Sequence, residues 1–120
     1  MPERPILIID DDPAIRTTVA DILESEGYTV ATANNGADGL QSLDRIDPVL
    51  VLLDMRMPIL DGWGFARALR SRGVQIPILV MTAAQDARRW AHEINAEGYV
   101  AKPFDLIDLL DAVGRFFPAA

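Results

Sequence analysis

The chain contains no cysteine, and His92 is its only histidine. These two shortages exclude disulfides, thiolate catalysis and the His/Cys ligand sets that usually hold zinc. Positive charge is also scarce, because 11 lysines and arginines stand against 18 acidic residues and leave a net charge of −7. Sequence-independent binding to nucleic acid or to an anionic membrane surface needs the opposite balance, so we expect neither direct nucleic-acid binding nor membrane binding.

Long apolar runs are missing as well. No segment approaches the length of a membrane span, and the first residues lack the apolar centre of a signal peptide. We therefore expect a cytoplasmic protein. The 120 residues, half of them hydrophobic, suffice for one domain with a real core. They contain no repeat, linker or low-complexity segment, so we expect a single domain over residues 1–120 and no second one.

Short apolar segments alternate with amphipathic ones along the whole chain. Residues 6–9 and 49–53 are apolar at every position, which is typical of parallel strands buried on both faces. The predicted strands are 5–9, 28–33, 49–53, 77–81 and 98–101, and the predicted helices are 13–26, 36–45, 61–71, 86–96 and 106–117. This alternation predicts an α/β fold in which helices cover both faces of a parallel sheet.

Helix boundaries are marked by familiar residues. Asp12 stands before Pro13, a pairing that favours a cap followed by the first helical residue, and Asp105 is the expected cap of the last helix. Gly27 and Gly73 are expected to end the first and third helices.

Aspartates follow two of the buried strands. Asp10, Asp11 and Asp12 come after the first strand, and Asp54 comes after the third. Carboxyl ends of parallel strands form the edge at which ligands bind in open α/β sheets. Carboxylates gathered there are costly unless a cation neutralises them, and Mg²⁺ prefers oxygen ligands. We therefore predict a magnesium pocket around a reactive Asp54, with Asp12 assigned to the helix cap instead.

Four segments at the ends of these strands resemble the receiver domain of two-component response regulators. They are residues 6–12 (ILIIDDD), 52–62 (LLDMRMPILDG), 80–84 (VMTAA) and 98–104 (GYVAKPF). The likeness covers essentially the whole chain, and the four motifs stand in register with the predicted strands. It implies a flavodoxin-like, doubly wound sheet of five strands in the order 2-1-3-4-5 with five helices.

The resemblance also implies chemistry. Asp54 would take a phosphoryl group from a histidine kinase or a histidine phosphotransfer protein in a reaction that needs Mg²⁺. Asp11 would bind the ion directly and Asp10 through water, with the backbone carbonyl of Arg56 as a further ligand. The chain would then be a phosphoacceptor switch, not an enzyme with a separate substrate.

Later residues complete the implied switch. Lys102 would contact the phosphoryl oxygens, and the resemblance places a cis bond between it and Pro103. The hydroxyl of Thr82 would turn toward the phosphoryl group, and Tyr99 would turn inward behind it. The surface of the fourth helix, fifth strand and fifth helix would then signal to a downstream protein or output domain. Homodimerisation on phosphorylation is a further expectation.

Three other classes of protein fit these residues less well. A phosphatase of the haloacid dehalogenase type carries a second acid two residues after its nucleophile, where this chain has Arg56. A nucleotide or flavin binder would need a glycine-rich loop after the first strand, where acidic residues would repel phosphate. A receiver-like adaptor that never takes phosphate is opposed by the intact set Asp11, Asp54, Thr82 and Lys102.

The sequence leaves two alternatives open for Arg56 and two for the helix face around Trp90. Arg56 could pair with an acidic neighbour at rest or contact the phosphate. Trp63 and Trp90 suit the core or a surface patch better than a cofactor site. Trp90, with Arg88 and Arg89, fits a partner patch and an ordinary solvated helix face equally well.

Overall fold

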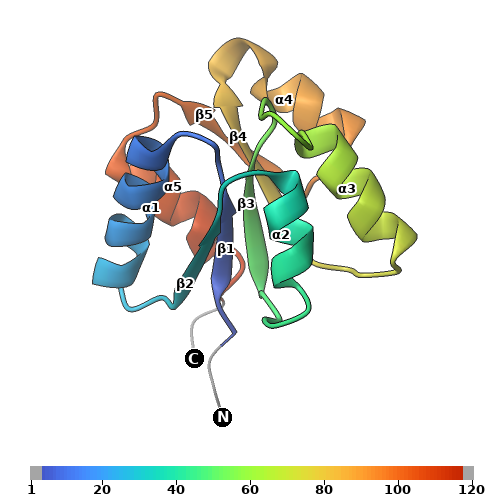
Figure 1. The fold of residues 1–120 in the computed structure, drawn as a ribbon. Helices are drawn as coiled ribbons and strands as arrows, with labels where there is room; N and C mark the ends of the chain where they lie inside the picture. The colour runs from blue at the N-terminus through green and yellow to red at the C-terminus, as the bar shows by residue number, and fades with distance from the viewer. Residues whose placement is uncertain (1–3, 118–120) are drawn as a thin grey trace.

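The computed structural model describes residues 4–117 and has three layers, with a central sheet between two layers of helices (Figure 1). The strands are β1 (Ile6–Ile9), β2 (Val30–Ala33), β3 (Leu50–Asp54), β4 (Ile78–Ala83) and β5 (Gly98–Lys102). All pair in parallel, in the order β2-β1-β3-β4-β5. The predicted doubly wound sheet is therefore confirmed, strand order included.

Five helices cover the two faces of the sheet. Helices α1 (Pro13–Ser25) and α5 (Leu106–Gly114) lie on one face, and α2 (Gly36–Ser42), α3 (Gly62–Ser71) and α4 (Ala84–Glu93) lie on the other (Figure 1). None of the helices in residues 4–117 is long and apolar enough to cross a bilayer.

The continuous apolar runs are explained by two cores, one on each face. In β1, Leu7 and Ile9 pack into the core under α2, α3 and α4. Ile6 and Ile8 point the other way, into the core under α1 and α5. Successive strand residues face opposite sides, so a strand covered on both faces needs an apolar residue at every position. Complete burial of one such side chain is worth about 1.5–3 kcal/mol, which fixes the central strands firmly.

The predicted caps are present. The carboxylate of Asp12 accepts from the backbone N–H of Ala14 at 2.9 Å, and Asp105 caps α5 in the same manner. Gly27 and Gly73 follow α1 and α3 with φ of +92° and +72°, a region that glycine adopts without a Cβ clash.

Helix α4 departs from its predicted bounds at both ends. It begins at Ala84 instead of 86, because β4 leads straight into it and Ala83 at the cap position gives no side-chain hydrogen bond that a sequence could signal. It ends at Glu93 instead of 96, because Asn95 takes φ of +54°. The N–H of Ala96 then bonds the carbonyl of Ala91 at 2.8 Å, the closure that glycine provides elsewhere.

Helices α2 and α5 are each three residues shorter than predicted, ending at Ser42 and Gly114. The residues after them form turns with bonds to the third residue back, such as Phe117 N–H to the Gly114 carbonyl at 3.1 Å. Strand β2 begins at Val30, two residues after its predicted start. These differences lie away from the carboxyl edge of the sheet and leave the predicted positions of Asp10 and Asp54 unchanged.

Candidate functional site

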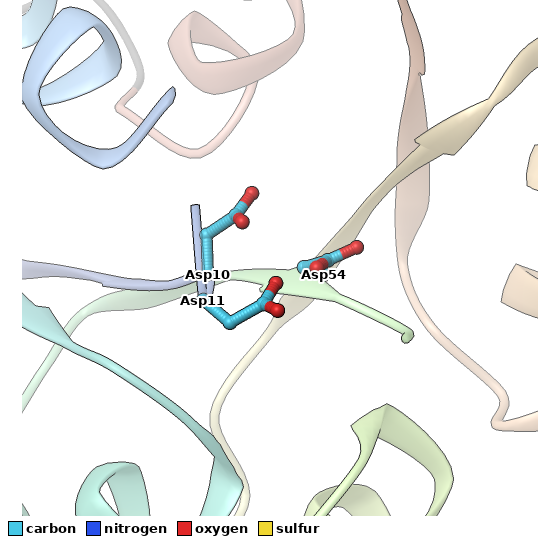
Figure 2. Close-up of side chains that lie close together, drawn as sticks. All are labelled: Asp10, Asp11 and Asp54. Carbon is cyan, nitrogen blue, oxygen red and sulfur yellow. The ribbon is translucent and has the colours of Figure 1, made fainter. Parts of the chain in front are cut away.

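Three carboxylates meet at the carboxyl edge of the sheet. Asp10 and Asp11 follow β1, Asp54 is the last residue of β3, and the two strands are neighbours in register (Figure 2). One ligand oxygen from each carboxylate lies within 4.8 Å of the others. No other group of three His, Cys, Asp or Glu side chains within residues 4–117 is close enough to share a metal ion. The predicted acidic cluster is thus present, and it could hold a cation.

Asp10 is fully buried and firmly held. One carboxylate oxygen accepts from the backbone N–H of Asp12 at 2.9 Å, and the other accepts from Lys102 Nζ at 2.9 Å. Arg16 donates to the Asp10 backbone carbonyl at 2.8 Å. The sequence interpretation missed Arg16, although its place in the first turn of the helix after Asp12 is a usable signal. These bonds fix the direction of the Asp10 carboxylate.

Lys102 is the last residue of the edge strand β5, and its side chain reaches the cluster across β4. Its Nζ lies 3.6 Å from Asp54 Oδ1, and its side chain is only 21% exposed. The Lys102–Pro103 peptide bond is cis, as the family resemblance implied. Lys102 therefore faces the acidic cluster and is not a free surface lysine.

The electrostatics of the cluster explain why a cation fits it. Burial raises the pKa of Asp54, the Asp10 carboxylate raises it further, and Lys102 only partly offsets them, so the pKa reaches about 7. One ammonium group is therefore too little positive charge for three carboxylates. A divalent ion bound to these oxygens would reverse the shift, because ligands of a cation are held in their charged form. The donor set, all carboxylate oxygen, is of the kind that Mg²⁺ or Ca²⁺ accepts.

The loop after Asp54 is pinned at both ends. Gly62 N–H donates to the Met55 carbonyl at 3.0 Å, and Gly36 N–H donates to the Leu60 carbonyl at 2.9 Å. A Cβ on Gly62 would lie 2.8 Å from Met55 Cα, so a larger residue would push the loop away from the strand. Asp61-Gly62 is thus more than the predicted cap of α3, because Gly62 also sets the path of the loop beside the cluster.

The two predicted switch residues lie on the neighbouring strands. Thr82, near the end of β4, is 6% exposed, and Tyr99 in β5 is 45% exposed. Thr82 pairs in register with Ala101, and Tyr99 pairs with Val80. Thr82 thus belongs to the same edge of the sheet as the cluster, whereas Tyr99 lies further back along its strand.

The side chains of Arg56 and Trp90 lie against each other. The Arg56 guanidinium carbon lies 5.0 Å from the centre of the Trp90 ring. The ion pair with an acidic neighbour, which was one of the two expectations for Arg56, does not form within residues 4–117. Trp90 is 5% exposed and part of the core, which confirms the core position expected for it and not the partner patch or the solvated helix face. Trp90 lies on a buried stripe with Ala87 and Ala91, at the spacing expected for one face of a helix.

Fold and site together define a doubly wound α/β domain with an acidic, cation-accepting cluster at its carboxyl edge. Residues 6–114 match the family described as the response regulator receiver domain, and the chain belongs to this family of two-component signalling proteins. This match favours the receiver interpretation over the haloacid dehalogenase and nucleotide-binder alternatives.

Curated relatives agree. Response regulator MprA of Mycobacterium leprae is 41% identical over 107 residues, covering 88% of this chain and 47% of that protein. Transcriptional regulatory protein PcoR of Escherichia coli is 36% identical over 110 residues, covering 90% of this chain and 49% of that protein. The chain thus spans about half the length of the curated relatives it matches.

Solved structures agree on the fold. The chemotaxis protein CheY4 of Vibrio cholerae superposes with a TM-score of 0.85 at 28% identity, over 97% of this chain and 100% of that one. Response regulator TrrA of Thermotoga maritima, solved in complex with Mg²⁺ and BeF, gives 0.84 at 29% identity, over 96% and 100%.

Proposed function

We propose that residues 1–120 form a single receiver domain in which Asp54 accepts a phosphoryl group from the phosphohistidine of a histidine kinase or phosphotransfer protein. The observation that carries this proposal is the convergence on Asp54 of two further carboxylates and of Lys102 Nζ at 3.6 Å. A receiver-like adaptor that never takes phosphate would have no need of such a costly cluster.

The proposed step is a direct transfer. A carboxylate oxygen of Asp54 attacks phosphorus in line, the new O–P bond makes an acyl phosphate, and the N–P bond breaks with its electron pair left on the histidine nitrogen. Two anionic groups must approach each other, so the site has to supply positive charge. Lys102 supplies part of it as a compact ammonium group, and Asp10 holds that group in place at 2.9 Å.

Mg²⁺ is the proposed cofactor. Asp11 and Asp54 would hold it directly and Asp10 through water, with the Arg56 backbone carbonyl as a further oxygen ligand. When bound, the ion supplies the positive charge that lets a carboxylate meet a phosphoryl group. Without an ion the pKa of Asp54 is about 7, so much of this carboxyl group would be protonated at neutral pH. The nucleophile must be ionised to react, and a bound cation would lower this pKa, which supports the assignment of Mg²⁺.

We infer that the response runs through Thr82 and Tyr99. Thr82 is buried beside the cluster, and its hydroxyl would donate to a phosphoryl oxygen once Asp54 is modified. Tyr99, now 45% exposed, would then turn inward and change the surface made by α4, β5 and α5. A phosphate charge near −2 would thus become a change of packing.

The partner of that surface is proposed to be a downstream protein or an output domain, with homodimerisation on phosphorylation as a second possible use. PcoR, a relative about twice the length of the match, is a transcriptional regulatory protein. For this chain an output on transcription is only a proposal drawn from that relative.

The proposal is tested by incubating the chain with acetyl phosphate and Mg²⁺ and weighing the intact protein. We expect one added phosphoryl group, none after chelation of the ion, and none in Asp54→Asn. Asp12→Asn is the matched control, because it removes the same charge from the same edge yet keeps a capping side chain. Labelling of Asp54→Asn at the level of the unaltered protein would overturn the assignment.

A further inference from the structure

Trp90 packs where the loop after Asp54, helix α3 and helix α4 meet. The Arg56 guanidinium carbon lies 5.0 Å from the centre of its ring, and the Trp63 ring meets it edge-on at 4.9 Å. Trp63 also donates from Nε1 to the Glu93 carboxylate of α4 at 2.9 Å. These contacts tie the loop that follows the phosphoacceptor to both helices.

Arg56 is the loosest member of this cluster. Across residues 4–117 no hydrogen bond or ion pair holds its side chain, and its guanidinium group lies over the Trp90 ring. Arg89 approaches the same ring at 5.9 Å but is held by Asp86 at 2.8 Å. Of two guanidinium groups near one indole, only Arg56 is free to leave without breaking an ion pair.

A phosphoryl group on Asp54 would compete for Arg56. Arg56 is two positions after Asp54, so their Cα atoms lie within about 7.6 Å, inside the span of an arginine side chain. Charge-assisted and bidentate bonds from arginine to phosphate are stronger than a cation–π contact at an exposed site. Modification of Asp54 therefore shifts the balance for Arg56 from the indole to the phosphoryl oxygens.

Helix α4 is built to register that shift. Its buried residues are Ala87, Trp90 and Ala91, so Trp90 is its only large anchor, and no side chain caps its first turn. A change at one face of the Trp90 ring thus acts on the largest buried side chain of this helix.

We propose that Arg56 is a second sensor of phosphorylation, which leaves the Trp90 ring for the phosphoryl group and so loosens α4. This inference rests on the proposed phosphorylation of Asp54. It adds a route to the α4 surface that is separate from Thr82 and Tyr99, and it uses the Arg56 side chain, whereas the proposed contact of Arg56 with the ion is through its backbone.

The test follows Trp90 alone. The chain has two tryptophans, so Trp63→Phe leaves Trp90 as the only one while keeping an aromatic ring against it. Mg²⁺ and beryllofluoride, a phosphoryl mimic, are added, and bound fluoride is verified by fluorine NMR. We expect the Trp90 emission to change, and most of that change to be lost in Trp63→Phe/Arg56→Met. Trp63→Phe/Arg89→Met is the matched control and should keep it.

A second readout needs no change to either tryptophan. With its guanidinium carbon 5.0 Å from the Trp90 ring centre, Arg56 should have an Nε–H proton resonance shielded by the ring current in the unaltered chain, and that resonance should move downfield when beryllofluoride binds. Absence of the resonance in Arg56→Met assigns it. A merely structural arginine would not show this shift.

The outcomes separate the two proposals. Beryllofluoride binding with an unmoved Arg56 resonance, or with an equal emission change in the Arg56→Met variant, would overturn the sensor and leave phosphorylation standing. Failure of the unaltered chain both to bind beryllofluoride and to take phosphate from acetyl phosphate would remove the proposed function, and the sensor with it.

Discussion

The centre of the sheet and its α4–β5 side differ in how completely their large side chains are buried. In β1 and β3 the apolar side chains from residues 6–9 and 50–53 are all 0% exposed. In α4 one large side chain is buried and the first turn has no side-chain cap, while Tyr99 in the edge strand β5 is 45% exposed. The carboxylates stand on the first region, and the proposed response runs through the second.

The difference has a physical reason. Reactive groups must be held to a fraction of an ångström, which a strand buried on both faces provides. An element that changes position in response to one added charge must instead be bound by only a few kcal/mol, because a larger attachment would not be shifted by that charge. A rigid centre and a movable side would thus be complementary requirements of the proposed switch.

The sharpest test of this contrast is to truncate one large side chain in each region to alanine. Leu52→Ala in β3 should lower the free energy of unfolding by about 3 kcal/mol, because it leaves a cavity in a packed core. Tyr99→Ala in β5 should cost less than about 1 kcal/mol, because nearly half of the side chain is already in water. Urea unfolding measures both, and equal losses would refute the contrast.

Without a bound cation, the acidic cluster should lower the free energy of unfolding of the chain. The pKa of Asp54 rises from 3.8 to about 7 on folding, so between these values the native chain keeps a proton that the unfolded chain has released. Stability in EDTA therefore falls as pH rises from about 4 to about 7, and the loss is complete above the folded pKa. Asp54→Asn should gain on the order of 2 kcal/mol near pH 8 and almost nothing near pH 3.5.

Chemical unfolding of both proteins across this pH range checks the prediction. A gain that is constant with pH would show that the asparagine acts through packing and not through the missing charge. Saturating Mg²⁺ should reverse the order of stability near neutral pH, because the ion binds the unaltered native state more tightly.

Ion binding should depend on which aspartate is lost. Asp11→Asn removes one of the three clustered carboxylates and should weaken Mg²⁺ affinity at least about tenfold, a change of about 1.4 kcal/mol. Asp12→Asn changes the net charge equally but lies in the α1 cap, so it should change the affinity by less than about twofold. Isothermal calorimetry compares them. Equal weakening would mean that general negative charge, not a defined pocket, attracts the ion.

The start of α4 should be easy to strengthen, because it has no side-chain cap. Ala83→Ser places a hydroxyl at the uncapped start of α4 and should stabilise the chain by about 1 kcal/mol. Ala84→Ser, one residue later and inside the first turn, should give no gain. Thermal unfolding distinguishes the pair, and a gain from both or from neither would contradict the account of α4.

Much of this molecule could be predicted from the sequence because its signals are local. Unbroken apolar runs mark strands buried on both faces, and Asp10 and Asp54 follow those runs, so parallel pairing brings them together without further information. The caps at Asp12 and Asp105 and the glycines after α1 and α3 are equally local.

What the sequence could not supply depends on contacts between distant segments or on atypical residues. The end of α4 at Asn95 uses a residue other than glycine in the left-handed region, and its start has no cap. The burial of Trp90 and its contact with Arg56 join residues 34 positions apart. Such a pair has no sequence spacing of its own, since only the packing of α4 against the loop after β3 creates it.

The central claim is that Asp54 is the residue that carries the phosphoryl group, and locating the group tests it most directly. The chain is treated with acetyl phosphate and Mg²⁺, the acyl phosphate is reduced with borohydride to homoserine, and the digest is sequenced by mass spectrometry. We predict homoserine at position 54 alone, and none there when phosphate donor or Mg²⁺ is left out. Homoserine at position 10, 11 or 12 in its place would contradict the account.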